Sequence, residues 1–493
     1  MNSSTPYLSL FALLAPFSAV CAADTAATES ASQPIGVYAE SAVSLSDGLH
    51  TPFWLTANRF GLASLERNNA YVSAGVLRET QNSNKLSVGF GAELAAAYRF
   101  DASVYVQQAY VALQYRWLQL TAGSRAYEPE IVERRLSSGG LVYSGNARPV
   151  PQLRISIPEY VSLGFTNHWF ALRGHLAYGI FTDNGFQKDF TAGKHAYVTN
   201  TLYHSKALFA KVGKPESLVD VEGGIEWYGQ FGGNKHFTDG TVYKAPHKLE
   251  DFFKMLIPLS GGSDSPVGDQ TNVLGNHIGA WHGAVTVKPG NWRIKGYAQH
   301  LFEDHSQLFA EYGRWKDGLL GLEITLPANS FVSKFLYEFM NSRDQSGPIY
   351  HDTTEAIPDQ VSARDAYWDH YFYQTWQHGG NMMGTPVIYS PLYNNNGSIN
   401  IRSNRTRMHH VGIEGAPATE WGYRMLLSYV QHWGTYSSPF DEISDTFSGM
   451  AEVRYSPTYL PGWDFRLAAA LDRSDWIGNN TGATVTVRKS FKF

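Results

Sequence analysis

Segments of about ten residues in which apolar and polar side chains alternate recur along this chain, and they constrain its fold most strongly. In residues 220–231, apolar Val221 and Ile225 occupy odd positions, and Glu222 and Glu226 occupy even positions. Alternation with a period of two predicts β-strands with one apolar and one polar face. The length is close to the ~9–11 residues that a tilted strand needs to cross a bilayer.

The connections between these segments alternate in length, short and then long. Short ones such as 288–291 and 327–329 contain Pro, Gly or Asn, the residues of tight turns. The predicted connections are, in chain order, 126–150, 166–168, 182–204, 214–219, 232–276, 288–291, 303–316, 327–329, 341–406, 416–420, 434–445, 456–462 and 473–481. Transmembrane barrels show this asymmetry, because their periplasmic turns are short and their extracellular loops long.

The strand count is even, which a barrel with both termini on the periplasmic side requires. One strand is predicted at 152–165 and twelve follow it. Five more are predicted before residue 126, near 35–45, 70–79, 85–99, 103–115 and 118–125, which gives eighteen. A soluble β-sandwich or propeller has no reason for such regularity. We therefore predict an all-β fold, a transmembrane antiparallel β-barrel of about 18 strands with long extracellular loops.

The composition excludes several other classes of protein. A formal net charge of −5 leaves no basic excess for a nucleic-acid partner. A single cysteine excludes a disulfide framework and a structural zinc site of the cysteine type. Charged residues make up 17% of the chain, against ~25% in typical soluble domains, and the chain has 46 Gly and 14% aromatic residues. This mixture is too apolar for a disordered protein and too rich in Gly and aromatics for a helical one, and it favours strands.

Both ends of the chain carry features of an exported outer-membrane protein. An apolar run at 7–20 precedes Cys21, Ala22 and Ala23, which predicts a signal peptide at 1–22. A short N-terminal segment would follow at 23–34, and the barrel at 35–493. Lipidation of Cys21 is the alternative, although Val20 before it is larger than such a site prefers. The last strand ends in Phe493, which resembles the signal read by the outer-membrane assembly machinery.

The chain contains no recognisable catalytic motif. We find no His-Glu-x-x-His helix, no Walker loop and no Gly-x-Ser-x-Gly elbow. The expectation is therefore a protein that is not an enzyme, with no cofactor and no metal site. A hydrolase built on a Ser–His pair is a more distant alternative, because such pairs form in space and leave no local trace.

Two predicted loops have the composition of a carbohydrate-binding surface. Loop 341–406 spans 66 residues rich in aromatic and amide side chains, among them Trp368, Tyr371 and Trp376. Exposed rings beside polar groups suit sugars, although the same rings could form a small core that folds the loop over the barrel mouth. Loop 126–150 contains Arg134 and Arg135 among glutamates. It could constrict a pore, grip a charged glycan or simply be solvated.

Four short stretches resemble the capsule assembly Wzi family of outer-membrane proteins. The stretches are 51–59 (TPFWLTANR), 138–155 (SGGLVYSGNARPVPQLRI), 275–278 (GNHI) and 347–352 (GPIYHD), and the resemblance extends over roughly 40–493. It implies an eighteen-stranded outer-membrane barrel that acts as a lectin and holds capsular polysaccharide on the cell surface. Founding members carry a periplasmic helical bundle for which this chain has no room, so it resembles the Bacteroidetes branch.

The resemblance and the loop composition together give two functional expectations. In the first, the barrel binds capsular or other surface polysaccharide, and alanine at Trp368 and Trp376 releases glycan without disturbing assembly. In the second, it is a porin-like channel for small solutes, since an eighteen-stranded barrel is wide enough for water. The candidate glycan contacts are Trp54, Asn58, Arg59, Arg134, Arg135, Trp368, Tyr371 and Trp376. The expected partners also include outer-membrane lipid and the assembly machinery.

Overall fold

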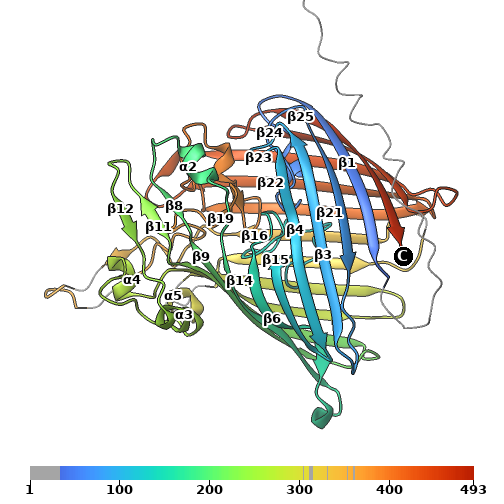
Figure 1. The fold of residues 1–493 in the computed structure, drawn as a ribbon, viewed down its shortest axis with the longest axis horizontal. Coiled ribbons are helices and arrows are strands. Elements are labelled where there is room, and N and C mark those ends of the chain that lie inside the picture. Colours follow the sequence, from blue (N-terminus) through green and yellow to red (C-terminus); the bar gives the residue numbers. More distant parts are fainter. Residues whose placement is uncertain (1–33, 304, 310–314, 330, 352–353, 359–360) are drawn as a thin grey trace, which may run out of the picture.

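Strands that follow one another in the sequence pair side by side, and the last strand pairs with the first, which closes the sheet (Figure 1). This computed structural model describes residues 34–303, 305–309, 315–329, 331–351, 354–358 and 361–493. The predicted signal peptide therefore lies outside the described residues. The strands of the wall are β1(Gly36–Asp47), β2(Asn69–Arg78), β3(Ser87–Tyr98), β4(Val104–Tyr115), β5(Leu118–Ser124), β6(Gln152–Ser162), β7(Phe170–Ile180), β9(Leu202–Val212), β10(Val219–Phe231), β13(Asn276–Val287), β14(Arg293–Phe302), β15(Gly318–Thr325), β16(Lys334–Asn341), β21(Thr406–Ala418), β22(Trp421–Gly434), β23(Pro439–Tyr455), β24(Trp463–Ser474) and β25(Asn480–Lys492).

These eighteen strands form one antiparallel sheet, and the predicted fold class is confirmed. Closure is complete over twelve residues of β1, from Gly36 opposite Lys492 to Asp47 opposite Thr481. Because the strand number is even, the start of β1 and the end of β25 lie at the same end of the barrel. A closed sheet has no free edge, which is what a β-protein needs in order to cross a bilayer.

The described residues contain no helix that is both long and apolar enough to span a membrane. The helices are short and lie in the connections, as do seven strands outside the wall. These elements are α1(Phe53–Thr56), η3(Gly164–Thr166), α2(Phe186–Thr191), β8(Tyr197–Thr199), β11(Asn234–His236), β12(Val242–Lys244), α3(Leu249–Leu256), α4(Val267–Thr271), α5(His305–Leu308), β17(Tyr350–His351), β18(Val361–Ser362), β19(Gln377–His378), β20(Asn381–Met382) and η4(Pro391–Tyr393).

The predicted difference between the two ends of the barrel is present, with one correction. Connections 125–151, 232–275 and 342–405 are long and lie at the end that we take as extracellular. The prediction of a long loop at 434–445 is wrong, because β22 and β23 continue to a turn of four residues at 435–438. Asp441 and Glu442 of β23 are exposed, and strand ends that project beyond the bilayer tolerate such polar side chains.

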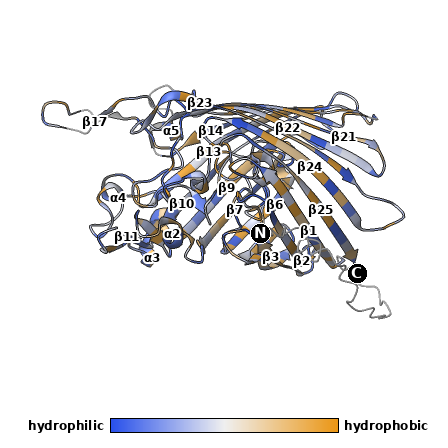
Figure 2. Ribbon diagram, turned by 90° about the horizontal axis from the view of Figure 1, so that it is seen from above, coloured by the Kyte–Doolittle hydropathy of each residue, from blue (hydrophilic) through white to orange (hydrophobic). Residues whose placement is uncertain are grey.

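The two faces of each strand meet different surroundings. On β10, Val221 points outward and is 47% exposed, while Glu226 points into the lumen and is 1% exposed. Figure 2 shows the resulting interleaving of apolar and polar residues along the wall. At the short-turn end, Trp169, Trp292 and Trp421 are exposed on the outside, as in the aromatic girdle of a membrane barrel.

The main hydrophobic core lies inside the barrel. Inward-facing residues of the wall, such as Ile278, Leu319 and Met340, pack against residues of the long loops, such as Leu141 and Trp376. The loops therefore occupy the space that would be water in an open channel.

Candidate functional site

The connection 125–151, which we call the plug, descends into the lumen. Glu338 of β16 fixes it to the wall, because one carboxylate accepts hydrogen bonds from four donors. The Ser137 hydroxyl lies 2.6 Å from Oε1, and the Ser138 backbone N–H and hydroxyl lie 2.7 and 2.6 Å from Oε2. The fourth donor is the Tyr297 hydroxyl at 2.5 Å. Glu338 is completely buried, so these bonds replace the water that the carboxylate loses.

A second loop, 48–68, enters the lumen beside the plug; we call it the inner loop. Its helix α1 begins where the Phe53 backbone N–H donates to Asp472 Oδ2 of β24 at 3.0 Å. The Trp54 ring packs on His410 of β21 with the ring centres 5.0 Å apart. The Asn58 backbone N–H donates to Asn146 Oδ1 of the plug at 3.0 Å. The inner loop is thus fixed both to the wall and to the plug.

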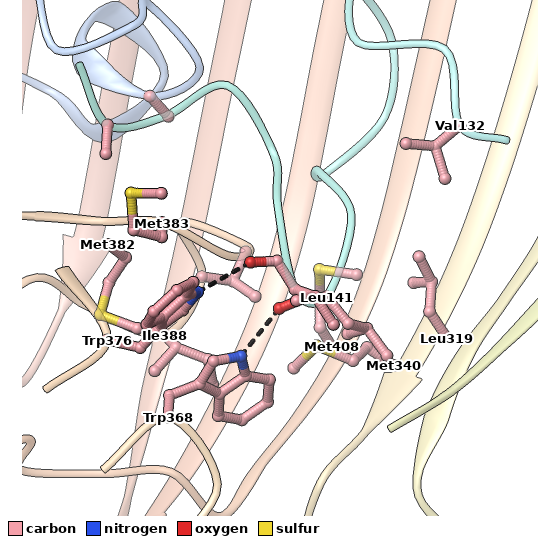
Figure 3. Packing of buried hydrophobic residues seen from close by; sticks show 14 of the residues in the cluster. Val132, Leu141, Leu319, Met340, Trp368, Trp376, Met382, Met383, Ile388 and Met408 are labelled. Carbon is pink, nitrogen blue, oxygen red and sulfur yellow. Dashed lines mark hydrogen bonds between the residues drawn. The ribbon is translucent and has the colours of Figure 1, made fainter. Parts of the chain in front are cut away.

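The connection 342–405, which we call the cap, covers the plug from the extracellular side. The Trp368 indole N–H donates to the Leu141 carbonyl at 2.8 Å, and the Trp376 indole N–H donates to the Val142 carbonyl at 2.9 Å (Figure 3). The Ser144 hydroxyl donates to the Gly384 carbonyl at 2.7 Å. Plug and cap therefore form one packed unit across the barrel mouth.

This packing corrects the expectation that Trp368 and Trp376 are exposed to glycan. Both side chains are 0% exposed, so the other interpretation holds and the rings belong to the core of the cap. Composition could not decide between the two, because it shows how many rings a loop has but not which of them find a partner. Tyr371 differs from them, since it is 57% exposed on the outer surface of the cap.

The other five candidate residues come together around one cavity of about 50 Å³, between the plug, the inner loop and β22. One water molecule needs ~10–15 Å³, so the cavity has room for a group of several atoms. The lining residues are Trp54, Ala57, Asn58, Arg59, Arg134, Arg135, Arg424 and Leu426. Arg424 lies near the start of β22, so the cavity is in the half of the lumen nearer the periplasm.

The cavity carries more positive than negative groups. Arg134 pairs with Glu128 at 2.9 Å, Arg135 with Glu414 at 3.3 Å and Arg424 with Glu452 at 3.1 Å. The Arg59 side chain makes no ion pair or hydrogen bond within the part of the chain that the structure describes.

Three buried polar atoms at the cavity also lack a partner within that part of the chain: Trp54 Nε1, Asn58 Oδ1 and Arg424 Nε. Two of them are donors, and buried donors are usually satisfied. Guanidinium groups bind carboxylate and phosphate through two parallel hydrogen bonds. The two unpaired donors and the arginines of the cavity therefore make a site suited to a small anion.

We expect inorganic phosphate or glucuronate to raise the melting temperature of the purified barrel. A ligand at a hundred times its dissociation constant stabilises the folded state by ~2.7 kcal/mol. Arg59→Gln should weaken anion binding by about tenfold or more, because a hydrogen bond to a charged group contributes ~1.5–3 kcal/mol. Arg293→Gln, at an exposed position away from the cavity, is the matched control. Equal anion effects in the two variants would contradict a specific site.

Tyr371 lies at the outer surface, beside polar groups. Its hydroxyl donates to Asp269 Oδ1 at 2.8 Å, and its ring centre is 4.5 Å from that of His370. Burial raises the pKa of Asp269, while the Gly275 N–H and the Tyr371 hydroxyl oppose that rise. Burial, with Lys235 nearby, lowers the pKa of His370 to about 3, so the imidazole is neutral at neutral pH. An exposed ring beside neutral and acidic hydrogen-bonding groups can take a sugar.

Sequence reasoning missed Glu338 and Arg424. Glu338 lies between Leu336 and Met340 on the inner face of β16, and a charge between two apolar residues of one face is a usable signal for a buried charge. The sequence gives no such signal for Arg424, because it is one of many polar residues at alternate positions of the strands. Among the described residues, no group of three or more His, Cys, Asp and Glu side chains could hold a metal ion.

No protein-family model matches the sequence, and no curated protein matches it significantly. The fold is similar to that of Wzi, an outer membrane protein involved in group 1 capsule assembly in Escherichia coli and described as a carbohydrate-binding β-barrel. The TM-score is 0.57 at 11% identity, over 91% of this chain and 83% of that one. The chain therefore has the fold of an outer-membrane β-barrel.

Two other solved barrels align over similar lengths but with lower structural similarity. Pseudomonas aeruginosa OccK5 (OpdH) gives a TM-score of 0.47 at 8% identity, over 94% of this chain and 98% of that chain. Acinetobacter baumannii OccAB4 gives 0.46 at 10% identity, also over 94% and 98%. At this level of similarity neither bears on the function of this barrel.

Proposed function

We propose that this barrel is a distant relative of the Wzi family that binds capsular or related surface polysaccharide and holds it on the cell surface. The observation that carries the proposal is the filled lumen. The plug, the inner loop and the cap pack into one core with the wall, which favours a binding protein over a channel. In this proposal the barrel is not an enzyme and needs no cofactor.

Two of the four stretches that resemble the Wzi family lie mainly in the interior of the barrel. Stretch 51–59 forms the part of the inner loop that contains α1, and stretch 138–155 forms the second half of the plug and the start of β6. Residues in close-packed interiors tolerate few substitutions, so a shared plug would leave this kind of short, scattered similarity. The Wzi protein whose fold this chain shares is described as a carbohydrate-binding β-barrel, which supports the proposal.

Tyr371 is the proposed glycan contact on the outer surface. Tyr371→Ala should reduce the polysaccharide retained on cells by about fivefold, since aromatic contacts contribute ~0.5–1.5 kcal/mol beyond the area they bury. The measurement is polysaccharide in the cell pellet and in the medium, at matched protein levels. Phe165→Ala is the control, because this ring is 88% exposed in a short turn at the other end of the barrel. Equal retention in both variants would remove Tyr371 from the site.

The function itself is tested by deleting the gene and measuring the same division of polysaccharide. Transfer into the medium with unchanged total production would support anchoring. An unchanged division would reject anchoring and bring the channel proposal forward. A signal peptide at 1–22 and recognition of the last strand by the assembly machinery remain predictions.

A further inference from the structure

Near the extracellular end of the barrel, β7, β9 and β10 carry polar side chains on the face that should meet lipid. Side chains alternate along β9, so Tyr203 and Phe209 point into the lumen and are buried there, whereas Leu208 points outward and is 58% exposed. Lys206 has the same parity as Leu208 and therefore points outward too. By strand register, it lies beside the outward-facing Trp227 of β10.

Helix α3 lies on the outside of the barrel and covers these polar groups. Lys206 Nζ donates to the carbonyls of Met255 and Leu256 at 3.0 and 2.7 Å, and so satisfies the C-terminal end of the helix. The Tyr178 hydroxyl of β7 donates to the Phe252 carbonyl at 2.7 Å. A side chain on Gly229 of β10 would place its Cβ 2.5 Å from Met255 Cε, so glycine there lets the helix contact the wall.

The opposite side of α3 is apolar and uncovered. Leu249, Phe253 and Ile257 recur every four residues along one side of the helix and its C-terminal end, with exposed fractions of 76%, 60% and 62%. The side toward the barrel buries Asp251 and Met255 instead. A helix in a water-exposed loop usually turns its apolar side toward the protein, but α3 leaves three large apolar side chains uncovered, while Asp251 and the carbonyls that Lys206 and Tyr178 bond face the wall.

We propose that Leu249, Phe253 and Ile257, which we call the α3 stripe, insert into the outer leaflet of the membrane. The argument is continuity with the lipid-facing wall, because the covered Lys206 is only two residues along β9 from the exposed Leu208. Leu208 lies next to Ile225 in the register, and Val221 farther along β10 is also exposed outward. The stripe continues this apolar surface upward over a polar section of the wall.

The α3 stripe has the character of an interfacial helix that lies at the boundary of headgroups and acyl chains. Connection 232–275 is then attached to the bilayer as well as to the barrel. Through Asp269 and Lys235, which bond the Tyr371 hydroxyl and carbonyl, it also supports the cap. Lipid contact at α3 would therefore hold the outer surface in place relative to the membrane.

Spin labels test the proposal directly, because the full chain has one cysteine, Cys21, which Cys21→Ser removes. Phe253→Cys is labelled with a nitroxide and reconstituted in vesicles of phosphatidylethanolamine and phosphatidylglycerol. Two controls flank it: Leu208→Cys on the lipid-facing wall, and Thr241→Cys, an exposed polar site in the same connection.

The label at Phe253→Cys should be more accessible to oxygen than to a water-soluble nickel chelate, as at Leu208→Cys and unlike at Thr241→Cys. Accessibility equal to that of Thr241→Cys would overturn the proposal. Dipolar broadening with low accessibility to both reagents would also overturn it, because it would show a second copy of the chain on the α3 stripe.

Discussion

Removing residues 128–147 is expected to turn a barrel that does not conduct into an open channel. Gly123 of β5 and Gln152 of β6 pair directly, so a linker of a few Gly and Ser residues can join the remaining ends without distorting the wall. The deletion removes the plug residues that Glu338 and the two cap tryptophans bind. Planar-bilayer recordings should show steady single-channel currents for the variant and none for the intact protein.

A shortened turn between β11 and β12, lacking residues 238–240, is the matched control, because this turn is exposed and lies outside the lumen. It should remain silent in the same recordings. Steady currents through the intact protein would contradict the filled lumen as the basis of the proposed function and favour the channel.

Trp376→Ala and Trp368→Ala are expected to loosen the cap severely while leaving the wall intact. Truncating a fully buried tryptophan costs ~3–5 kcal/mol, and each change also leaves a buried carbonyl of the plug without its donor, at ~1–3 kcal/mol. Protease cleavage within 342–405 should accelerate strongly, while the folded barrel keeps its characteristic mobility on gels without heating. Trp376→Phe should fall between the wild type and alanine, because it retains a ring but not the indole N–H.

This result would change the meaning of glycan release by the double alanine variant. Since both rings are buried, release would follow from a disordered cap and not from lost stacking on sugar. Unchanged protease resistance in both single variants would contradict the packing of the cap on the plug. Tyr371→Ala removes an exposed ring and should leave the protease resistance of the cap unchanged. It therefore separates the loss of a glycan contact from a loss of cap stability.

The wall could be predicted from the sequence because a strand between two environments needs a side-chain period of two. Eighteen strands and the two kinds of connection followed from this pattern. The pattern failed at 434–445, where the strands leave the bilayer and polar residues occur on both faces. Strand ends are therefore defined by pairing in the sheet, as between His432 and Ser444, and not by hydropathy.

The interior of the barrel was only partly predictable. The charges of loop 126–150 allowed a plug, a glycan contact or a solvated loop, and the partner that decides for the plug is Glu338, about 200 positions away. The resemblance to the Wzi family brought forward Trp54, Asn58 and Arg59, and the structure places them on one cavity with Arg134 and Arg135. The types of these residues could not show that the cavity they line lies deep in the lumen, far from the outer surface.

The filled lumen leaves the middle of each wall strand with hydrocarbon on one side and protein on the other. In a water-filled channel, the inner face of each strand meets water, where a new charge is harmless. At the level of the plug, neither face of this wall meets water. A charge introduced on either face must displace lipid or protein atoms, and a polar group on the inner face needs a partner in the plug or on a neighbouring strand, as Glu338 has in Ser137 and Arg424 has in Glu452. The wall is therefore buried on both faces, by lipid outside and by protein inside, which gives a physical reason for the low content of ionisable residues.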